Sequence, residues 1–519
     1  MKKLTFFTLL WLAVFSSRAQ DAPVSFLSEP IAISTEGWNK VLQMKNGNTL
    51  LFHFELKKST IVKVFNKDHK EIASVKPDFK LIDVRQIDNA TFQGLIDVGG
   101  EATLFISQQV DNVNTLVRLR FNGANGELTN EDRVVRSASL AKETQVKVLK
   151  SEKEEGYHIA CFTYKEPDTS AIIKLMNFNG KNEEVDEIPY EIPTRGFDFT
   201  TLVTSDIDRA GNILIVSCLA KIIQYPELMD RTLVINYLPK NESTFTTNMV
   251  KLPEKIALSS VAFAVNPFAN NINWVVNKEW VTKYGDKNIS EQQESMYIIP
   301  ESITAMKERY LNHDTANKSL AKLKGDTSAR YWGNVKSMYT NNLGKTTVFF
   351  ENRDNITDQQ RIQNNRIVCA GDICMAEYDD NGTEISSILL PKSNYYAPVT
   401  YPPLAFGTVS EWELYSSLFF NSKKSHYIVY NESAENYSIA PGSLTRPVFN
   451  YDNTDATFYH ITKDFITKQS FILPENNCHH QLYIGSASYD EKGNSIAGLM
   501  KQNKAGQTTL HLLWYKFID

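Results

Sequence analysis

The sequence has few of the residues that define several protein classes. It contains 5 cysteines, 23 glycines and 18 prolines in 519 residues. Five cysteines are too few for a fold built on disulfides, and glycine and proline are too scarce for a collagen or a low-complexity chain. Because 42% of the residues are hydrophobic and 11% are aromatic, we expect a globular protein with a large buried core.

Positive charge is not in excess over the whole chain. Lys and Arg number 55 against 60 Asp and Glu, and the formal net charge is −5. No segment gathers basic residues into a cluster, so the sequence offers no electrostatic basis for binding nucleic acid or anionic lipid. We therefore expect no nucleic-acid partner.

The longest apolar run lies at the N-terminus and is too short to cross a membrane, which takes about 20 residues. Lys2 and Lys3 precede the uncharged residues 4–15, and Ser17-Arg18-Ala19 places small residues at positions −3 and −1 of a cut after Ala19. This pattern is typical of a secretory signal peptide. We expect a signal peptide over residues 1–19, export to the periplasm or the extracellular space, and no membrane insertion. The alternative is a buried N-terminal helix.

Helical periodicity is nearly absent from the rest of the chain. Short alternating runs rich in β-branched and aromatic residues, which are typical of strands, fill most of it. Glycine-containing turns lie between these runs at Gly47, Gly99, Gly156 and Gly211, which are 52, 57 and 55 residues apart. This nearly constant spacing indicates a repeated unit.

A second feature keeps the same period. Alternating strands end in an aromatic residue at Phe65, Phe121, Phe178 and Tyr237, in steps of 56, 57 and 59 residues. Two independent features with one period indicate an internal repeat more strongly than turn residues alone. A unit of this length holds four short antiparallel strands, which bury their faces only against neighbouring units. We predict an all-β fold, a β-propeller of seven or eight four-stranded blades, with residues 20–519 as one domain.

The two ends of the chain predict how the ring closes. The last unit stops after residues 510–515, whereas earlier units continue into an outer strand, and residues 26–34 supply a spare strand. We predict that this N-terminal strand pairs with the C-terminal blade and closes the ring, which leaves no open edge between the first and last blades.

Residues 281–330 interrupt the repeat. After Pro300, a helix would carry Ile303, Met306 and Tyr310 on one face, and proline is well tolerated at the start of a helix. We expect a partly helical insertion on a blade here, which either covers a sheet edge or acts as a lid or docking arm.

The motifs of zinc hydrolases, serine hydrolases and phosphate-binding loops are absent from the sequence. Asp206 and Asp208 alternate before Gly211 as in the first half of a calcium loop, but the twelfth position holds Ser217 rather than Glu. An Asp-rich hairpin turn is the favoured interpretation. We expect no metal and no cofactor, and Asp206 and Asp208 are the remaining metal candidates.

Two groups of residues containing cysteine are candidates for a disulfide and for metal ligands. Cys369 and Cys374 flank a turn-like segment that predicts a tight hairpin, and export would permit a disulfide between them. Five cysteines do not fix the connectivity, so free thiols stay an alternative. Cys478-His479-His480 is the densest group of soft ligands, but successive strand residues point to opposite faces, so only Cys478 and His480 would converge.

Aromatic residues gather in a segment stiffened by proline, residues 394–403, with Trp412 a little further on. Tyr395, Tyr396, Tyr401 and Trp412 are candidates for stacking on sugar rings or for anchoring a protein partner. The alternative is that these rings fold back onto the blade.

The repeat and the N-terminal signal together resemble exported bacterial β-propeller proteins of uncharacterised function. The resemblance extends over nearly all of residues 20–519 but is architectural, because the chain lacks the Trp-Asp dipeptide of WD repeats and the Ser-x-Asp-x-Gly box of sialidases. It therefore implies a fold and no functional residues.

The sequence favours a non-enzymatic exported propeller that binds a protein or a glycan through loops on one face of the ring. Two alternatives stay open. One is a carbohydrate-active enzyme, a glycoside hydrolase or lyase, with acidic residues converging at the central channel. The other is an envelope component whose propeller only scaffolds assembly.

Overall fold

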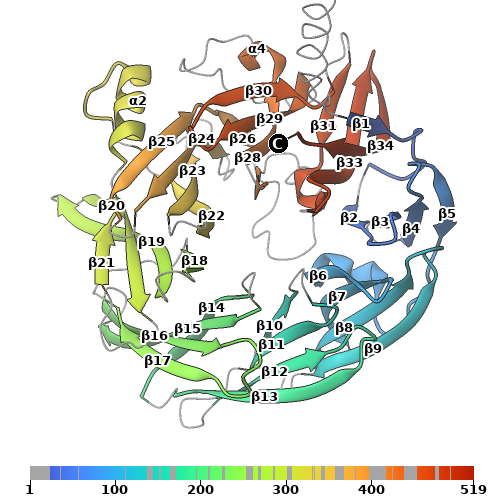
Figure 1. Cartoon of the computed structure of the whole chain (residues 1–519), viewed down its shortest axis with the longest axis horizontal. Helices are drawn as coiled ribbons and strands as arrows, with labels where there is room; N and C mark the ends of the chain where they lie inside the picture. Colours follow the sequence, from blue (N-terminus) through green and yellow to red (C-terminus); the bar gives the residue numbers. More distant parts are fainter. Residues whose placement is uncertain are drawn as a thin grey trace, which may run out of the picture.

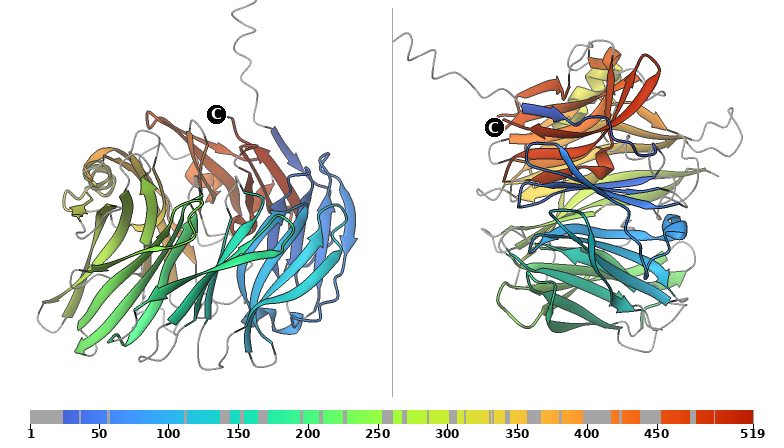
Figure 2. Two further views of the ribbon diagram at one scale, coloured as in Figure 1. Left: turned by 60° about the horizontal axis from the view of Figure 1, so that its bottom comes forward. Right: turned by 90° about the vertical axis from the view of Figure 1, so that its right-hand side faces the viewer.

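The sheets of this computed structural model stand side by side in a ring (Figure 1), which Figure 2 shows obliquely and edge-on. The structure describes residues 24–518 except 36, 56–57, 111–112, 137–143, 151–153, 164–170, 194–195, 208–210, 225–227, 253–260, 267–270, 285–286, 301–306, 312, 330, 332, 341–344, 357–366, 380–381, 397–416, 423–424, 438–452, 474–477 and 491.

Seven of the sheets each hold four consecutive antiparallel strands, whose order in space follows their order in the sequence. The first strand of these blades lies toward the centre of the ring and the fourth at its rim (Figure 1). The first four blades are β2 (Trp38–Gln43), β3 (Thr49–Phe54), β4 (Thr60–Phe65) and β5 (Glu71–Val75); β6 (Thr91–Val98), β7 (Glu101–Val110), β8 (Val113–Asn122) and β9 (Leu128–Arg136); β10 (Thr144–Leu149), β11 (Tyr157–Thr163), β12 (Ala171–Phe178) and β13 (Glu184–Ile192); and β14 (Phe199–Ile207), β15 (Ile213–Gln224), β16 (Leu228–Leu238) and β17 (Thr246–Lys251).

The next three blades complete this series, and the sixth carries an additional strand, β26 (Asn394–Tyr396), which pairs with β24. They are β18 (Val261–Asn266), β19 (Asn271–Tyr284), β20 (Lys287–Pro300) and β21 (Lys307–Tyr310); β22 (Asn334–Thr340), β23 (Thr346–Ile356), β24 (Ile367–Tyr378) and β25 (Glu384–Leu390); and β27 (Leu418–Asn421), β28 (Ser425–Ser433), β29 (Thr454–Thr462) and β30 (Thr467–Phe471). A short 3-10 helix, η1 (Val84–Asn89), precedes β6, and α4 (Ala434–Tyr437) follows β28.

The eighth sheet joins the two ends of the chain, in the order β1-β34-β33-β31, with β32 also paired to β33. Its strands are β1 (Val24–Leu27), β31 (His479–Leu482), β32 (Ser488–Asp490), β33 (Ser495–Lys504) and β34 (Gln507–Lys516), with the 3-10 helix η3 (Ile484–Ser486) between β31 and β32. β1 runs antiparallel to β34 from the pair Val24 and Lys516 to the pair Leu27 and Leu513. Counting this composite sheet, the described residues form eight blades, so the predicted β-propeller and the predicted mode of closure are both confirmed.

Hydrogen bonds extend the closure beyond β1. The amide nitrogen of Ser28 donates to the carbonyl of Leu512 (2.9 Å), and Ser28 Oγ accepts from the amide of Leu512 (2.9 Å). His511 Nδ1 lies 2.8 Å from the carbonyl oxygen of Ser28. Trp514 Nε1 donates to Thr49 Oγ1 of the first blade (2.9 Å), so the composite sheet is also tied to the next blade in the ring.

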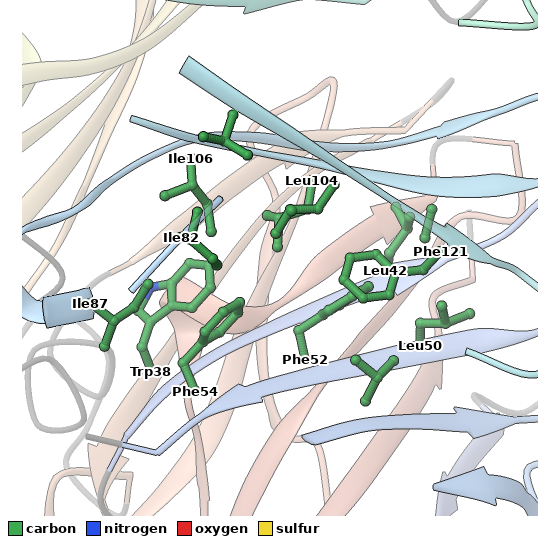
Figure 3. Close-up of a cluster of buried hydrophobic side chains, with 14 of the residues drawn as sticks. Trp38, Leu42, Leu50, Phe52, Phe54, Ile82, Ile87, Leu104, Ile106 and Phe121 are labelled. Carbon is green, nitrogen blue, oxygen red and sulfur yellow. The ribbon is translucent and has the colours of Figure 1, made fainter. Parts of the chain in front are cut away.

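The hydrophobic cores lie between neighbouring blades. Figure 3 shows the core between the first two, where Trp38, Phe52 and Phe54 pack toward Leu104 and Ile106. Because the inner strands are covered on both faces, all six residues of β3 are buried. In the rim strand β5, by contrast, every residue is exposed or half-buried. Burying a side chain of this size contributes about 1.5–3 kcal/mol, so the stability of each blade depends on its two neighbours.

Both repeating features of the sequence form turns at one end of the ring. Asn66 Oδ1 accepts from the amide of Lys70 (3.0 Å), and Asn179 Oδ1 accepts from the amide of Glu183 (3.1 Å), each between the third and fourth strands. Gly99, between β6 and β7, has a φ of +60°, and an added Cβ would come within 2.2 Å of the carbonyl oxygen of Gly180 in the next blade. Only glycine fits such a close approach.

The helix near residues 281–330 lies later in the chain than the sequence suggests. α2 spans Asp314–Lys324 and ends at Gly325, whose φ of +64° suits a helix C-cap. Residues 307–310, expected in a helix, form β21 instead, because they complete the fifth blade by pairing with β20. Ala316 and Leu320 of α2 are buried in the core of the sixth blade. Among the described residues, no helix combines the length and apolarity needed to cross a membrane.

Ser28→Ala tests the closure. The substitution leaves the buried amide of Leu512 without the acceptor Ser28 Oγ, so we expect the free energy of unfolding to fall by about 1–3 kcal/mol. Ser25→Ala, at an exposed position of the adjoining strand β1, is the matched control and should change it by less than about 0.5 kcal/mol. Urea denaturation measures both, and equal effects would contradict the assigned role of Ser28.

Candidate functional site

The two ends of the ring differ in the length of their connections. At one end, which we call the turn-rich face, the connections from the first to the second strand and from the third to the fourth strand have seven residues or fewer. At the other end, the long-connection face, the chain passes between blades through residues 76–90, 311–333 and 391–417, and links β28 to β29 through residues 434–453. Long connections on a rigid scaffold are where binding residues are usually found.

A buried ion pair lies beneath this face, between the sixth and seventh blades. Lys392 Nζ lies 2.7 Å from Glu351 Oε1, and the side chains are 1% and 7% exposed. Lys392 Nζ also donates to Ser417 Oγ (2.7 Å), which in turn donates to Glu351 Oε1 (2.9 Å). We call these three residues the clamp, because Lys392 and Ser417 stand at the two flanks of residues 393–416.

Neighbouring polar groups complete the surroundings of the clamp. Lys336 Nζ lies 3.2 Å from Glu351 Oε2, so the carboxylate is shared between two ammonium groups. Lys392 Nζ also lies 5.2 Å from the centroid of the Tyr430 ring, within the range of a cation–π contact. Buried charges need such partners, because their transfer from water costs several kcal/mol for each ion.

The clamp holds its glutamate in the charged form. Burial alone would raise the pKa of Glu351, but the charges of Lys392 and Lys336 and the hydrogen bond from Ser417 outweigh it, and the pKa is lowered. Glu432, which is 1% exposed on β28, shows the opposite balance. Burial raises its pKa despite a hydrogen bond from Asn436. The pKa values of the two glutamates therefore shift in opposite directions, because Glu351 has two ammonium partners at contact distance whereas burial dominates at Glu432.

The geometry of the clamp suits structural support better than nucleophilic catalysis. A serine beside a lysine can act as a nucleophile only if the amine accepts the hydroxyl proton. Here Lys392 donates to both Glu351 and Ser417, and Ser417 donates to the same carboxylate oxygen. The arrangement joins three segments of the chain that are distant in sequence.

The aromatic candidates belong to the segment whose flanks the clamp joins. Tyr395 and Tyr396 lie in β26, opposite Cys369 and Val368 of β24. Their side chains, and the whole of Tyr401 and Trp412, lie outside the described residues. The structure therefore places β26 beside β24 in the sixth blade, with Lys392 before it and Ser417 after it in the sequence.

The metal candidate Asp206 lies at the opposite, turn-rich face. Asp206 is in β14, next to the turn into β15, and its Oδ1 accepts from the amide of Ile207 (2.8 Å). Asp208 lies outside the described residues. Within the described part of the chain, no group of three or more His, Cys, Asp and Glu side chains is placed to hold a metal ion.

Cys369 and Cys374 lie in one continuous strand rather than on two strands of a hairpin. Both belong to β24, where the register pairs Cys369 with Asp354 and Cys374 with Phe350. Five residues of extended strand separate Cα atoms by roughly 15 Å, whereas a disulfide needs less than about 7 Å. This strand therefore does not allow the disulfide that the hairpin interpretation implied. The short turn expected at Gly371 does not form because β24 continues through it to pair with β23.

Two histidines, the buried His53 and the half-buried His426, are held in the neutral form. His53 is 1% exposed, and its Nδ1 lies 2.8 Å from Asn39 Oδ1 while its Nε2 has no hydrogen-bond partner among the described residues. Burial lowers the pKa of His53 to about 4, although Glu55 partly opposes the shift. Burial, together with the charge of Lys463, also lowers the pKa of His426 to about 4.

Comparisons with known proteins show similarity in fold alone. No protein-family model and no curated protein matches the chain. A prolyl endopeptidase is similar in structure with a TM-score of 0.39, 9% identity and coverage of 91% of this chain and 55% of that one. The chain thus spans about half the length of that enzyme. The WD40 domain of SCAP from fission yeast has a TM-score of 0.35, 8% identity and coverage of 96% and 98%.

A binding protein is also among the similar structures. The lectin BP39L from Burkholderia pseudomallei has a TM-score of 0.36, 8% identity and coverage of 92% of this chain and 98% of the lectin. Enzymes and binding proteins occur together among these structures, and their similarity to this chain concerns the propeller and not its activity.

Lys392→Met tests the clamp. It leaves the Glu351 carboxylate buried with one ammonium partner fewer, so we expect a loss of about 3 kcal/mol in the free energy of unfolding. Lys345→Met removes a more exposed pair with Glu377, with side chains 39% and 14% exposed, and should cost about 0–1 kcal/mol. The double variant Lys392→Met, Glu351→Gln should lose less than the sum of its single changes. Equal losses for Lys392→Met and Lys345→Met in denaturant titrations would show that the clamp stabilises the fold no more than a surface ion pair does.

The lowered pKa values of His53 and His426 predict a pH dependence of stability. Between pH 6.5 and about 4, His53 and His426 bind protons in the unfolded chain but not in the folded one, so the free energy of unfolding falls as the pH is lowered through this window. His53→Asn keeps a donor toward Asn39 and should flatten this part of the profile by up to about 3 kcal/mol. Urea titrations at a series of pH values measure the difference. Parallel wild-type and variant profiles from pH 7 to 4 would refute this assignment.

Proposed function

We propose that the protein is an exported, non-enzymatic β-propeller that binds a protein or a glycan through loops on the long-connection face. The observation that carries the proposal is the clamp, since Lys392 and Ser417 flank the segment that contains Tyr395, Tyr396, Tyr401 and Trp412. A binding segment with a fixed base loses less conformational entropy when it takes up a ligand.

The state of the ionisable groups near this face supports binding rather than catalysis. Lys392 and Glu351 satisfy each other inside the clamp, and Asp455 accepts from the amide of His480 while its second oxygen lies 3.0 Å from His479 Nδ1. General acids and bases need a proton that is exchanged with substrate. These described groups are instead engaged in contacts with one another. The export part of the proposal rests on the pattern of residues 1–19.

The aromatic residues of the segment provide the test. Soluble polysaccharides and candidate envelope proteins are screened by thermal shift, because a ligand of the folded state raises the melting temperature. Tyr401→Ala and Trp412→Ala should each weaken binding by about tenfold or more, as expected for aromatic anchors. Ile466→Ala, at a side chain 66% exposed on the turn-rich face, is the control and should bind as the wild type does.

Three outcomes are distinguishable. Binding lost with Tyr401→Ala and Trp412→Ala supports the proposal. Binding that survives both changes, or that is lost with Ile466→Ala, contradicts it. Turnover of a bound polysaccharide into products would replace it with the alternative of a carbohydrate-active enzyme.

A further inference from the structure

A pair of soft side chains lies buried near the start of β31. Cys478 Sγ is 3.8 Å from His480 Nε2, and the two residues are 3% and 1% exposed. His479 lies between them in sequence and contacts Asp455 instead, with 3.0 Å between His479 Nδ1 and Asp455 Oδ2. The alternation expected of a strand is therefore present, and it brings one thiol and one imidazole together.

A third polar group adjoins the pair from the neighbouring strand. The register places Gln502 of β33 opposite His480. The Gln502 side-chain nitrogen lies 3.0 Å from Cys478 Sγ and 3.3 Å from His480 Nε2. A half-turn of this amide about its last bond would present its oxygen, a metal ligand, in place of its nitrogen.

Further hydrogen bonds fix the three groups. Asp455 Oδ1 accepts from the amide nitrogen of His480 (2.8 Å), which holds the backbone of β31. Thr509 Oγ1 lies 3.4 Å from Gln502 Oε1 and 2.9 Å from His511 Nε2, so after the half-turn it would accept from the amide nitrogen of Gln502 instead. Such outer contacts orient the ligands of metal sites.

The separation of sulfur and nitrogen matches one bound ion. A bound ion lies about 2.3 Å from a thiolate sulfur and about 2.0–2.1 Å from an imidazole nitrogen. These bond lengths place sulfur and nitrogen about 3.8 Å apart when the angle at the ion is trigonal and about 3.6 Å apart when it is tetrahedral. The observed 3.8 Å needs no rearrangement of the two side chains.

We propose that Cys478 and His480, with the side-chain oxygen of Gln502 as third donor, bind a soft ion of low coordination number, represented by Cu(I). Thiolate and imidazole ligands favour such ions. A structural zinc site needs four ligands, and the described residues bring no third His, Cys, Asp or Glu to this place. The ion displaces the thiol proton of Cys478, which is released to solvent.

An anaerobic titration of the full chain with Cu(I), in competition with the chelator bicinchoninate, tests the proposal. We expect one Cu(I) per chain, with binding abolished by Cys478→Ser and by His480→Gln. Gln502→Ala should weaken the affinity by about tenfold. Cys218→Ser is the control and should bind as the wild type does, because Cys218 Sγ contacts the carbonyl of Leu219 rather than an imidazole and burial raises its pKa to about 11.

Unaltered binding by His480→Gln would overturn the proposal, because it would mean that the ion is held by a lone thiol. X-ray absorption of the copper-loaded wild type identifies the atoms bound to copper. This measurement needs no variant, so it stands even if the variants fail to fold. One sulfur with nitrogen or oxygen neighbours supports the site, and sulfur neighbours alone refute it. The result leaves the proposed ligand binding untouched, because that depends on residues 393–416.

Discussion

The antiparallel pairing of β1 with β34 is the interaction on which the ring depends. Each blade buries its faces only against its neighbours, so an open seam would expose the apolar faces of the first blade and of the composite sheet. Leu51 of β3 and Leu512 of β34 share one core across this seam. Hydrogen bonds between residues 484 positions apart, Ser28 and Leu512, thus hold together a structure that is otherwise built from local repeats.

In the closed ring, the two faces differ in how much additional chain they can accommodate. The turn-rich face is limited by tight turns, in which Asn66 and Gly99 leave little room for added chain. The long-connection face has no such limit and carries the insertions. Where a long segment leaves the scaffold, buried polar contacts such as Lys392 with Ser417 fix its flanks. Stability in the blades and variation in the loops are therefore separated, as in other scaffolds that carry binding sites on connections.

The fold could be predicted because its determinants are local. The alternation of strands, the turn at Gly47 and the Asn66 turn are all visible within a few residues, and their period identifies the blade. The clamp could not be predicted in this way, because Glu351 is 41 residues from Lys392 and 66 from Ser417, and no spacing rule connects them. The convergence of Cys478 and His480 followed from strand alternation, whereas Gln502 needed the register of β33.

Native-state hydrogen exchange tests the central claim, that closure by β1 and β34 determines the stability of the whole ring. The account predicts that the amides of Ser28 and Leu512 exchange only with the same opening free energy and the same denaturant dependence as amides inside the blades, such as Leu104. Exchange of Ser28 and Leu512 at a much lower free energy, with Leu104 still protected, would show that the ring persists when the seam opens and would contradict it.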